Sequence, residues 1–311
     1  MLKHLVLTAA NMPAVHHLVT DTALGRQMAS RFVAGDNLDA AMPAIADLNQ
    51  RGIHASLDYL GENTSNAAEA TKTADDYVAI LDRIAATGAD ANISIKLTAL
   101  GLDIGEAVCL GNVRRVLERA CALNIFVRID MEGSVYTEPT LRLVHLLHRE
   151  FAGRSTIPGG VVGTVIQSML FRSGEDVAGL VAEGIRVRLV KGAYREPASI
   201  AFPNKFDVDE HYRQLLRTLL AEGIYPAIAT HDEGMIAEAR RFAHERGIEP
   251  TRFEFQMLYG IRRDLQERLV RDGYNVRVYV PYGTQWYPYL SRRMAERPAN
   301  LMFVVNNALR S

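Results

Sequence analysis

The chain alternates between short apolar runs and longer stretches in which apolar residues recur at helical spacing. The apolar runs are rich in β-branched residues, as expected of buried strands. Their starts lie roughly 25 to 40 residues apart, which is the size of a strand–helix unit. The eight runs are Ile53–Leu57, Ile93–Leu97, Phe126–Ile129, Val161–Ile166, Val187–Val190, Tyr225–Ala229, Phe253–Phe255 and Val276–Val280.

The stretches between these runs predict helices, several of which end at a glycine shortly before the next run. Glycine is common just after a helix because it adopts the left-handed conformation without steric penalty. Thr137 is the predicted N-cap of one helix, and Pro139 lies in its first turn. The other predicted helices are Ala67–Ala86, Val113–Leu123, Asp207–Ala221, Asp232–Glu245 and Ile261–Arg271.

Eight strand–helix units in 311 residues favour an α/β fold of the (βα)8 TIM-like barrel type. A doubly wound open sheet is the alternative. Ala- and Leu-rich segments, punctuated by Pro13 and Pro43, precede the first strand and predict helices. We therefore expect an N-terminal helical extension over residues 1–50 and a barrel over residues 51–311.

The composition is that of an ordinary globular protein. Hydrophobic residues make up 48% and charged residues 23% of the chain, and the formal net charge is −1. Such a balance does not favour a nucleic-acid partner. No apolar run approaches a membrane span, and the first residues lack the pattern of a signal peptide. We expect a cytoplasmic protein, with peripheral contact at the inner face of a membrane left open.

Several cofactor motifs are absent from the sequence. There is no G-x-G-x-x-G after a strand, no P-loop, no H-E-x-x-H and no G-x-S-x-G. The two cysteines, Cys109 and Cys121, are too far apart for a paired metal site and are expected to be buried thiols. These observations argue against a Rossmann or P-loop nucleotide site, and we expect no metal.

Polar residues stand at the end of nearly every predicted strand, where a parallel barrel gathers its chemistry. Each has a simpler individual explanation: Lys96 could extend to water, and His231 could be a satisfied histidine at a helix start. Their recurrence at one rim is what indicates a site. These residues are Asp58, Lys96, Asp130, Glu132, Gln167, Lys191, Thr230, His231, Gln256, Tyr279 and Tyr282.

The fifth apolar run contains an arginine, Arg188, and is followed by Lys191 and Gly192. A strand covered on both faces should be nearly continuous in apolar residues, and a buried guanidinium must find a partner. Conflicts of this kind occur mainly at functional sites. Arg188 is therefore predicted to meet an anionic or electron-rich ligand.

The segment 287–296 predicts a helix after the eighth strand and contains two adjacent arginines. Glu296 lies four residues after Arg292 and three after Arg293, so it can orient either guanidinium on a helix. The two guanidinium groups could converge on one substrate carboxylate. The simpler explanation of the two arginines is that they belong to a solvated, charged face of the helix.

Taken together, these segments resemble the proline dehydrogenase family. The most specific ones are Arg188–Tyr194 followed by Glu196-Pro197, and the Tyr-Leu-x-Arg-Arg of Tyr289–Arg293. The resemblance spans roughly residues 50 to 305 and is closest to the short, single-activity bacterial form. The supporting segments are Ile95–Leu97, Arg128–Glu132, Ala229–Asp232, Phe255–Gly260 and Tyr279–Gly283.

The resemblance implies a distorted (βα)8 barrel that binds FAD at the carboxyl ends of its strands. It implies oxidation of L-proline to Δ1-pyrroline-5-carboxylate by hydride transfer from proline C5 to flavin N5, with electrons passed to a membrane quinone. Asp130 and Arg188 would be catalytic. Substrate would be bound by Lys96, Tyr279, Arg292 and Arg293. FAD would be contacted by Met131, Gln167, Arg188, Lys191, Gly192, Ala193, Thr230 and His231.

Two other functions are compatible with the same strand-end residues. In a lysine-dependent aldolase, Lys96 or Lys191 would form a Schiff base with a carbonyl substrate. A non-catalytic barrel would bind carboxylates without turnover. A bound flavin that bleaches on addition of proline distinguishes the first function from both alternatives.

Overall fold

Eight parallel strands close into a barrel in chain order, and β8 pairs with β1. The chain is seen in a computed structural model, which describes residues 20, 22, 25, 27, 29–61 and 64–296, the last five as helical backbone only. The closed sheet confirms the predicted (βα)8 barrel over the open sheet. The strands are β1 (His54–Tyr59), β2 (Ala91–Ile95), β3 (Val127–Ile129), β4 (Val162–Gln167), β5 (Arg186–Val190), β6 (Ala227–Ala229), β7 (Glu254–Leu258) and β8 (Asn275–Tyr282).

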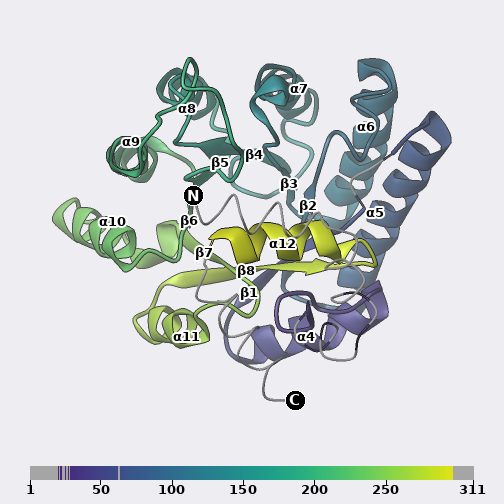
Figure 1. The fold of residues 1–311 in the computed structure, drawn as a ribbon, viewed down its shortest axis with the longest axis horizontal. Coiled ribbons are helices and arrows are strands. Elements are labelled where there is room, and N and C mark those ends of the chain that lie inside the picture. The colour runs from purple at the N-terminus through teal and green to yellow at the C-terminus, as the bar shows by residue number, and fades with distance from the viewer. Residues whose placement is uncertain are drawn as a thin grey trace.

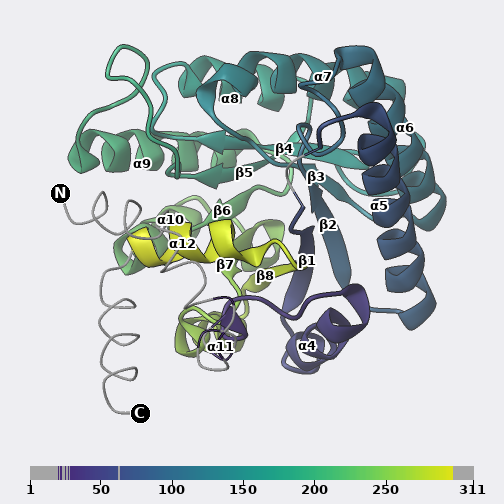
Figure 2. The ribbon, with the colours of Figure 1, turned by 45° about the vertical axis from the view of Figure 1, so that its right-hand side comes forward.

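Helices follow the strands and form an outer ring around the barrel (Figure 1). Figure 2 shows α5 and α6 packed side by side in this ring. The helices are α4 (Leu38–Gln50), α5 (Ala67–Thr87), α6 (Glu106–Leu123), α7 (Thr137–Glu150), α8 (Ser173–Ala182), α9 (Lys205–Glu222), α10 (Glu233–Glu245), α11 (Arg263–Arg271) and α12 (Trp286–Glu296). Short 3-10 turns span Ser134–Tyr136 and Pro250–Arg252.

Most predicted helices are found with small shifts at their ends, and the N-cap prediction at Thr137 is wrong. Tyr136 is the N-cap of α7, because the preceding 3-10 turn already brings Thr137 into helical conformation at φ −59° and ψ −52°. Sequence reasoning also missed α8, which is short and contains Gly174 and Gly179. Two glycines in ten residues weaken the helical signal.

Two helices depart from the regular strand–helix alternation. Helix α4, which precedes β1, packs against β1 and β8 and places Ala41, Ile45 and Leu48 in the main core. It therefore stands in the outer ring between α11 and α5, where the helix after β8 lies in a regular barrel (Figure 1). Helix α12 instead packs with Leu60, the residue after β1, and so lies at the carboxyl ends of the strands.

The interior of the barrel is polar, unlike the branched apolar filling that is usual for this fold. Gly163 leaves room for this filling, because a Cβ there would collide with the carbonyl oxygen of Arg186 and the ring of Phe126. Buried charges need partners, so the interior is organised by ion pairs. The buried polar residues in or directly after the strands include Ser56, Asp58, Asn92, Ser94, Arg128, Asp130, Gln167, Arg186, Arg188, Glu254, Gln256 and Arg277.

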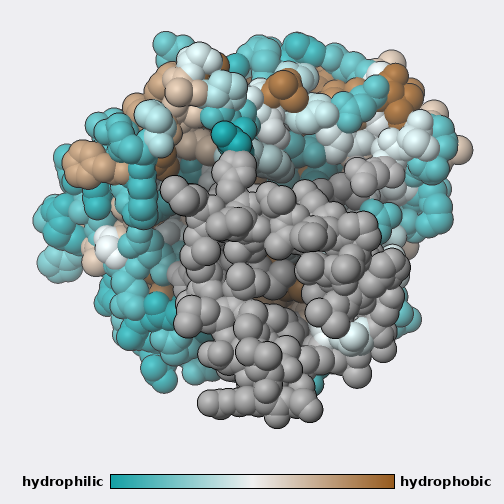
Figure 3. Space-filling model, viewed as in Figure 1, coloured by the Kyte–Doolittle hydropathy of each residue, from teal (hydrophilic) through white to brown (hydrophobic). Residues whose placement is uncertain are grey.

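Where Figure 3 is coloured, the outer surface is largely hydrophilic, with separate apolar spots. The most exposed large apolar side chains include Val135, Phe171 and Phe206. Within the described part of the chain, no helix is long and apolar enough to cross a membrane. The same residues contain no cluster of three or more histidine, cysteine or acidic side chains with the arrangement of a metal site.

Candidate active site

Asp130 lies directly after β3 and contacts side chains from β5, from β8 and from the residue after β2. Tyr279 Oη donates to Asp130 Oδ2 at 2.7 Å, and Arg188 Nη2 donates to Asp130 Oδ1. Lys96 Nζ lies 4.0 Å from Asp130 Oδ2. The structure thus brings together four residues that are far apart in the sequence. All four were predicted to share a site.

Lys96 follows β2 and is buried in an ion pair. Its Nζ lies 2.7 Å from Oδ1 of Asp58, whose side chain is 1% exposed. The simpler explanation that Lys96 extends to water is therefore wrong, because the side chain is only 9% exposed. A lysine held between carboxylates suits a positioning role better than the free amine that a Schiff base requires.

Arg188 projects from β5 into the same network. Besides Asp130, its Nη1 donates to Ser94 Oγ and Gln256 Oε1, each at 3.4 Å. Its guanidinium carbon lies 5.1 Å from the centre of the Tyr279 ring, within range of a cation–π contact. The buried arginine seen in the sequence therefore has a partner within the protein, and this partner fixes the guanidinium.

Tyr279 is half-buried beside Asp130 and Arg188, and the protonation state of its hydroxyl follows from that position. Burial, together with the charges of Asp130 and Asp58, raises the pKa of the Tyr279 hydroxyl well above its usual range. Tyr279 therefore stays a neutral phenol, and its hydroxyl is the donor to Asp130.

Lys191 forms a second charged cluster at the ends of β5 and β6. Its Nζ lies 2.6 Å from Asp209 Oδ1 and 2.9 Å from Asp232 Oδ2. Burial acts to raise the pKa of Asp232, but the ion pair with Lys191 lowers it overall. Asp232 also caps α10, and its backbone N–H donates to Thr230 Oγ1 at 3.0 Å. The Lys191 side chain is therefore held between two carboxylates.

His231 and Gln167 are each tied to a neighbouring strand or loop. Leu258 N donates to His231 Nε2 at 3.0 Å, so that nitrogen must be unprotonated. Gln167 Nε2 donates to the carbonyl oxygen of Glu132 at 3.0 Å. The Glu132 carboxylate in turn accepts from Thr98 N at 3.2 Å. These bonds hold the loops after β3, β4 and β6 in place.

The segment after β5 turns sharply at Gly192, where φ is +112°. Other residues rarely adopt this conformation, and a Cβ there would also collide with Met169 Sδ. The backbone conformation and the packing against Met169 therefore explain why position 192 is a glycine, without reference to a ligand. Ala193 follows it and is half-buried, and Met131, after β3, is buried.

Arg292 and Arg293 belong to α12, but their side chains lie outside the described residues. The helix itself is placed by Trp286, Tyr289 and Leu290, which pack with Leu60 at the carboxyl end of β1. The predicted carboxylate clamp stays a prediction.

Sequence reasoning missed a second charged layer, deeper in the barrel. Arg277 Nε lies 3.0 Å from Glu254 Oε2, and Gln256 Nε2 donates to Glu254 Oε1 at 2.5 Å. Arg128 Nη1 donates to the carbonyl oxygens of Thr164 and Arg186, each at 2.9 Å. The signal was available, because these charged residues interrupt predicted apolar strands just as Arg188 does.

A family model described as proline dehydrogenase matches residues 41–306. The proline dehydrogenase of Deinococcus radiodurans is 43% identical over 98% of this chain and 97% of its own length. Proline dehydrogenase 1 of Bacillus subtilis is 41% identical over 91% of both chains.

The barrel also resembles a solved structure of proline utilization A from Bdellovibrio bacteriovorus, inactivated by N-propargylglycine. The TM-score is 0.80 at 27% identity, over 87% of this chain and 32% of that longer one. Fold and sequence agree: this chain is a proline dehydrogenase by family, an oxidoreductase of the first step of proline catabolism.

Proposed function

We propose that the chain oxidises L-proline to Δ1-pyrroline-5-carboxylate, with FAD as cofactor and a membrane quinone as electron acceptor. The observation that carries the proposal is the network around Asp130, which joins Lys96, Arg188 and Tyr279 at the barrel mouth. Cationic groups held rigidly at one end of a barrel suit an amino-acid carboxylate and a developing negative charge.

The groups at the ends of β4, β5 and β6 have the chemistry that FAD needs. Gln167 offers a carboxamide, Lys191 an ammonium and Thr230 a hydroxyl, from three adjacent strands. Such groups suit the carbonyl and phosphate oxygens of a dinucleotide. Arg188 borders the same rim, and the adjoining residues Met131, Gly192, Ala193 and His231 complete the proposed cofactor surface. When bound, FAD would supply the acceptor for hydride from proline C5.

Substrate binding and positioning would be carried out by side chains of the protein. Tyr279, a neutral phenol, would pack against the pyrrolidine ring, while Arg292 and Arg293 would bind the substrate carboxylate. Lys96 would border the same substrate space. Asp130 already accepts from Tyr279 and Arg188, so we assign it the role of holding them rather than of moving a proton.

Arg188 would stabilise negative charge that develops on reduction. Its guanidinium is fixed by Asp130, Ser94 and Gln256, so it needs no rearrangement during the reaction. Quinones are lipid-soluble, so we propose that the protein makes peripheral contact with the cytoplasmic face of a membrane to pass on its electrons.

Steady-state assays with L-proline and an artificial electron acceptor test the clamp. For Arg292→Met we expect the KM for proline to rise about 30-fold, because a charged hydrogen bond of about 2 kcal/mol is lost. The turnover number should change much less, since the interaction acts on binding. Arg271→Met, an exposed arginine at the end of α11, is the control. An unchanged KM in Arg292→Met would refute the clamp.

A further inference from the structure

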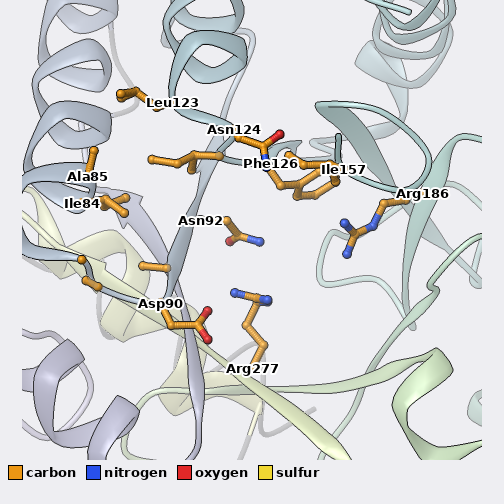
Figure 4. A pocket seen from close by; sticks show the side chains of 14 residues that line it. Ile84, Ala85, Asp90, Asn92, Leu123, Asn124, Phe126, Ile157, Arg186 and Arg277 are labelled. Atoms are coloured by element: carbon orange, nitrogen blue, oxygen red, sulfur yellow. The ribbon is translucent and has the colours of Figure 1, made fainter. Parts of the chain in front are cut away.

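A pocket opens at the end of the barrel opposite to Asp130. Its volume is about 390 Å³, and residues at or before the amino ends of β2, β3 and β5 line it. Its polar lining includes Arg186, Arg277 and Asn92, and Figure 4 shows the ends of these three side chains turned toward the same space. Asp90 and Asn124 are the other polar residues of the lining. Nothing in the proposed proline oxidation uses this pocket.

Positive charge exceeds negative charge in the barrel layer behind this pocket. Arg128, Arg186 and Arg277 are all buried, and Glu254 is a buried carboxylate that faces all three. Arg277 is paired with Glu254 at 3.0 Å. Guanidinium groups stay charged in proteins, so the excess of buried positive charge favours a bound anion.

Arg186 is buried beside two aromatic rings. Its guanidinium carbon lies 4.3 Å from the centre of the Phe126 ring and 4.4 Å from that of Tyr225. Both distances are within the range of a cation–π contact, and Arg186 Nε has no hydrogen-bond partner among the described residues. Asn92 Oδ1, also buried, likewise lacks a partner in the described part of the chain. Hydrogen-bonding capacity thus remains at the pocket.

We propose that this pocket binds a small organic acid through its carboxylate. Planar guanidinium edges match the geometry of a carboxylate. The lining also includes Ile84, Ile125 and Ile157, which could contact a short hydrocarbon body that a hydrated phosphate lacks. Asp90 is the acidic group of the lining; it pairs with His54 at 2.6 Å and disfavours multiply charged anions.

Hydrogen–deuterium exchange on the full chain tests this site without relying on activity. The probe is isobutyrate, with chloride at equal ionic strength as the blank and phosphate as a second anion. We expect isobutyrate to slow exchange saturably around residues 84–92 and 123–128, and phosphate to act more weakly. Slowing confined to the strand carboxyl ends would place the anion at the proline site and overturn the proposal.

Three variants sharpen the test. Arg186→Gln should weaken isobutyrate protection at least about ten-fold, the effect of losing roughly 1.4 kcal/mol of charged hydrogen bonding. Arg186→Lys should retain part of it. Asp90→Asn should bind isobutyrate several-fold more tightly, because a like charge is removed. If neither anion slows exchange at these residues, the arginines only fill the barrel and the proposal is wrong. Equal protection by phosphate, or no tighter binding in Asp90→Asn, would show that the pocket does not select a small organic acid and would also overturn it.

Discussion

Asp130→Ala is expected to lower the free energy of unfolding by about 3–5 kcal/mol, the range for breaking a buried ion pair from one side. The alanine would leave the buried Arg188 guanidinium without its carboxylate and would remove the acceptor of Tyr279 Oη. Turnover of L-proline should also be lost, because Lys96, Arg188 and Tyr279 lose the carboxylate that they share. Urea unfolding followed by circular dichroism measures the stability change.

The matched control is Asp264→Ala, which breaks an exposed pair. Asp264 Oδ2 lies 2.9 Å from Arg262 Nη2, and its side chain is 63% exposed. Exposed pairs contribute about 0–1 kcal/mol, so this variant should stay close to the parent protein. If the two variants lose equal stability, the Asp130 network is not what organises the barrel mouth.

Arg188→Met is expected to slow reduction of the bound cofactor by proline about 100-fold, the typical effect of removing one fixed electrostatic donor. Proline binding should change little, because the carboxylate is assigned to Arg292 and Arg293. Anaerobic stopped-flow reduction across a range of proline concentrations separates the limiting rate from the apparent dissociation constant.

Arg188→Lys is the companion variant. Lysine keeps the charge but cannot reach Asp130, Ser94 and Gln256 with one planar group, so partial recovery of the rate is expected. If Arg188→Met reduces its cofactor at the rate of the unchanged protein and contains the normal amount of FAD, the proposed electrostatic role of Arg188 is wrong.

The barrel could be predicted from the sequence because its signal is local. Each strand is a short apolar run, and the spacing of the runs leaves room for one helix between them. The outer position of α4 was not predictable in the same way. Its apolar face, with Ala41 and Ile45, shows that it is buried, but not that β1 and β8 cover it. That pairing depends on contacts across the whole length of the chain.

The candidate residues were predicted because they stand at strand ends, but the ion pairs and hydrogen bonds that join them were not predicted. Asp58 was seen as a polar residue after a strand, but only the fold shows that it pairs with Lys96. Arg188 was identified because it interrupts an apolar strand. The same criterion applied to Arg128, Glu254 and Arg277 would have revealed the deeper charged layer. The close approach of Gly192 to Met169 could not be predicted either, because it depends on the fold and not on sequence spacing.

Anaerobic addition of L-proline to the purified protein, followed by visible absorption, tests the central claim most directly. The proposed function predicts flavin bands that bleach as proline is added and return with an added quinone. A colourless protein that gains neither flavin nor activity from added FAD would contradict it. Trapping of a lysine by borohydride in the presence of a ketone would then identify the Schiff-base enzyme instead.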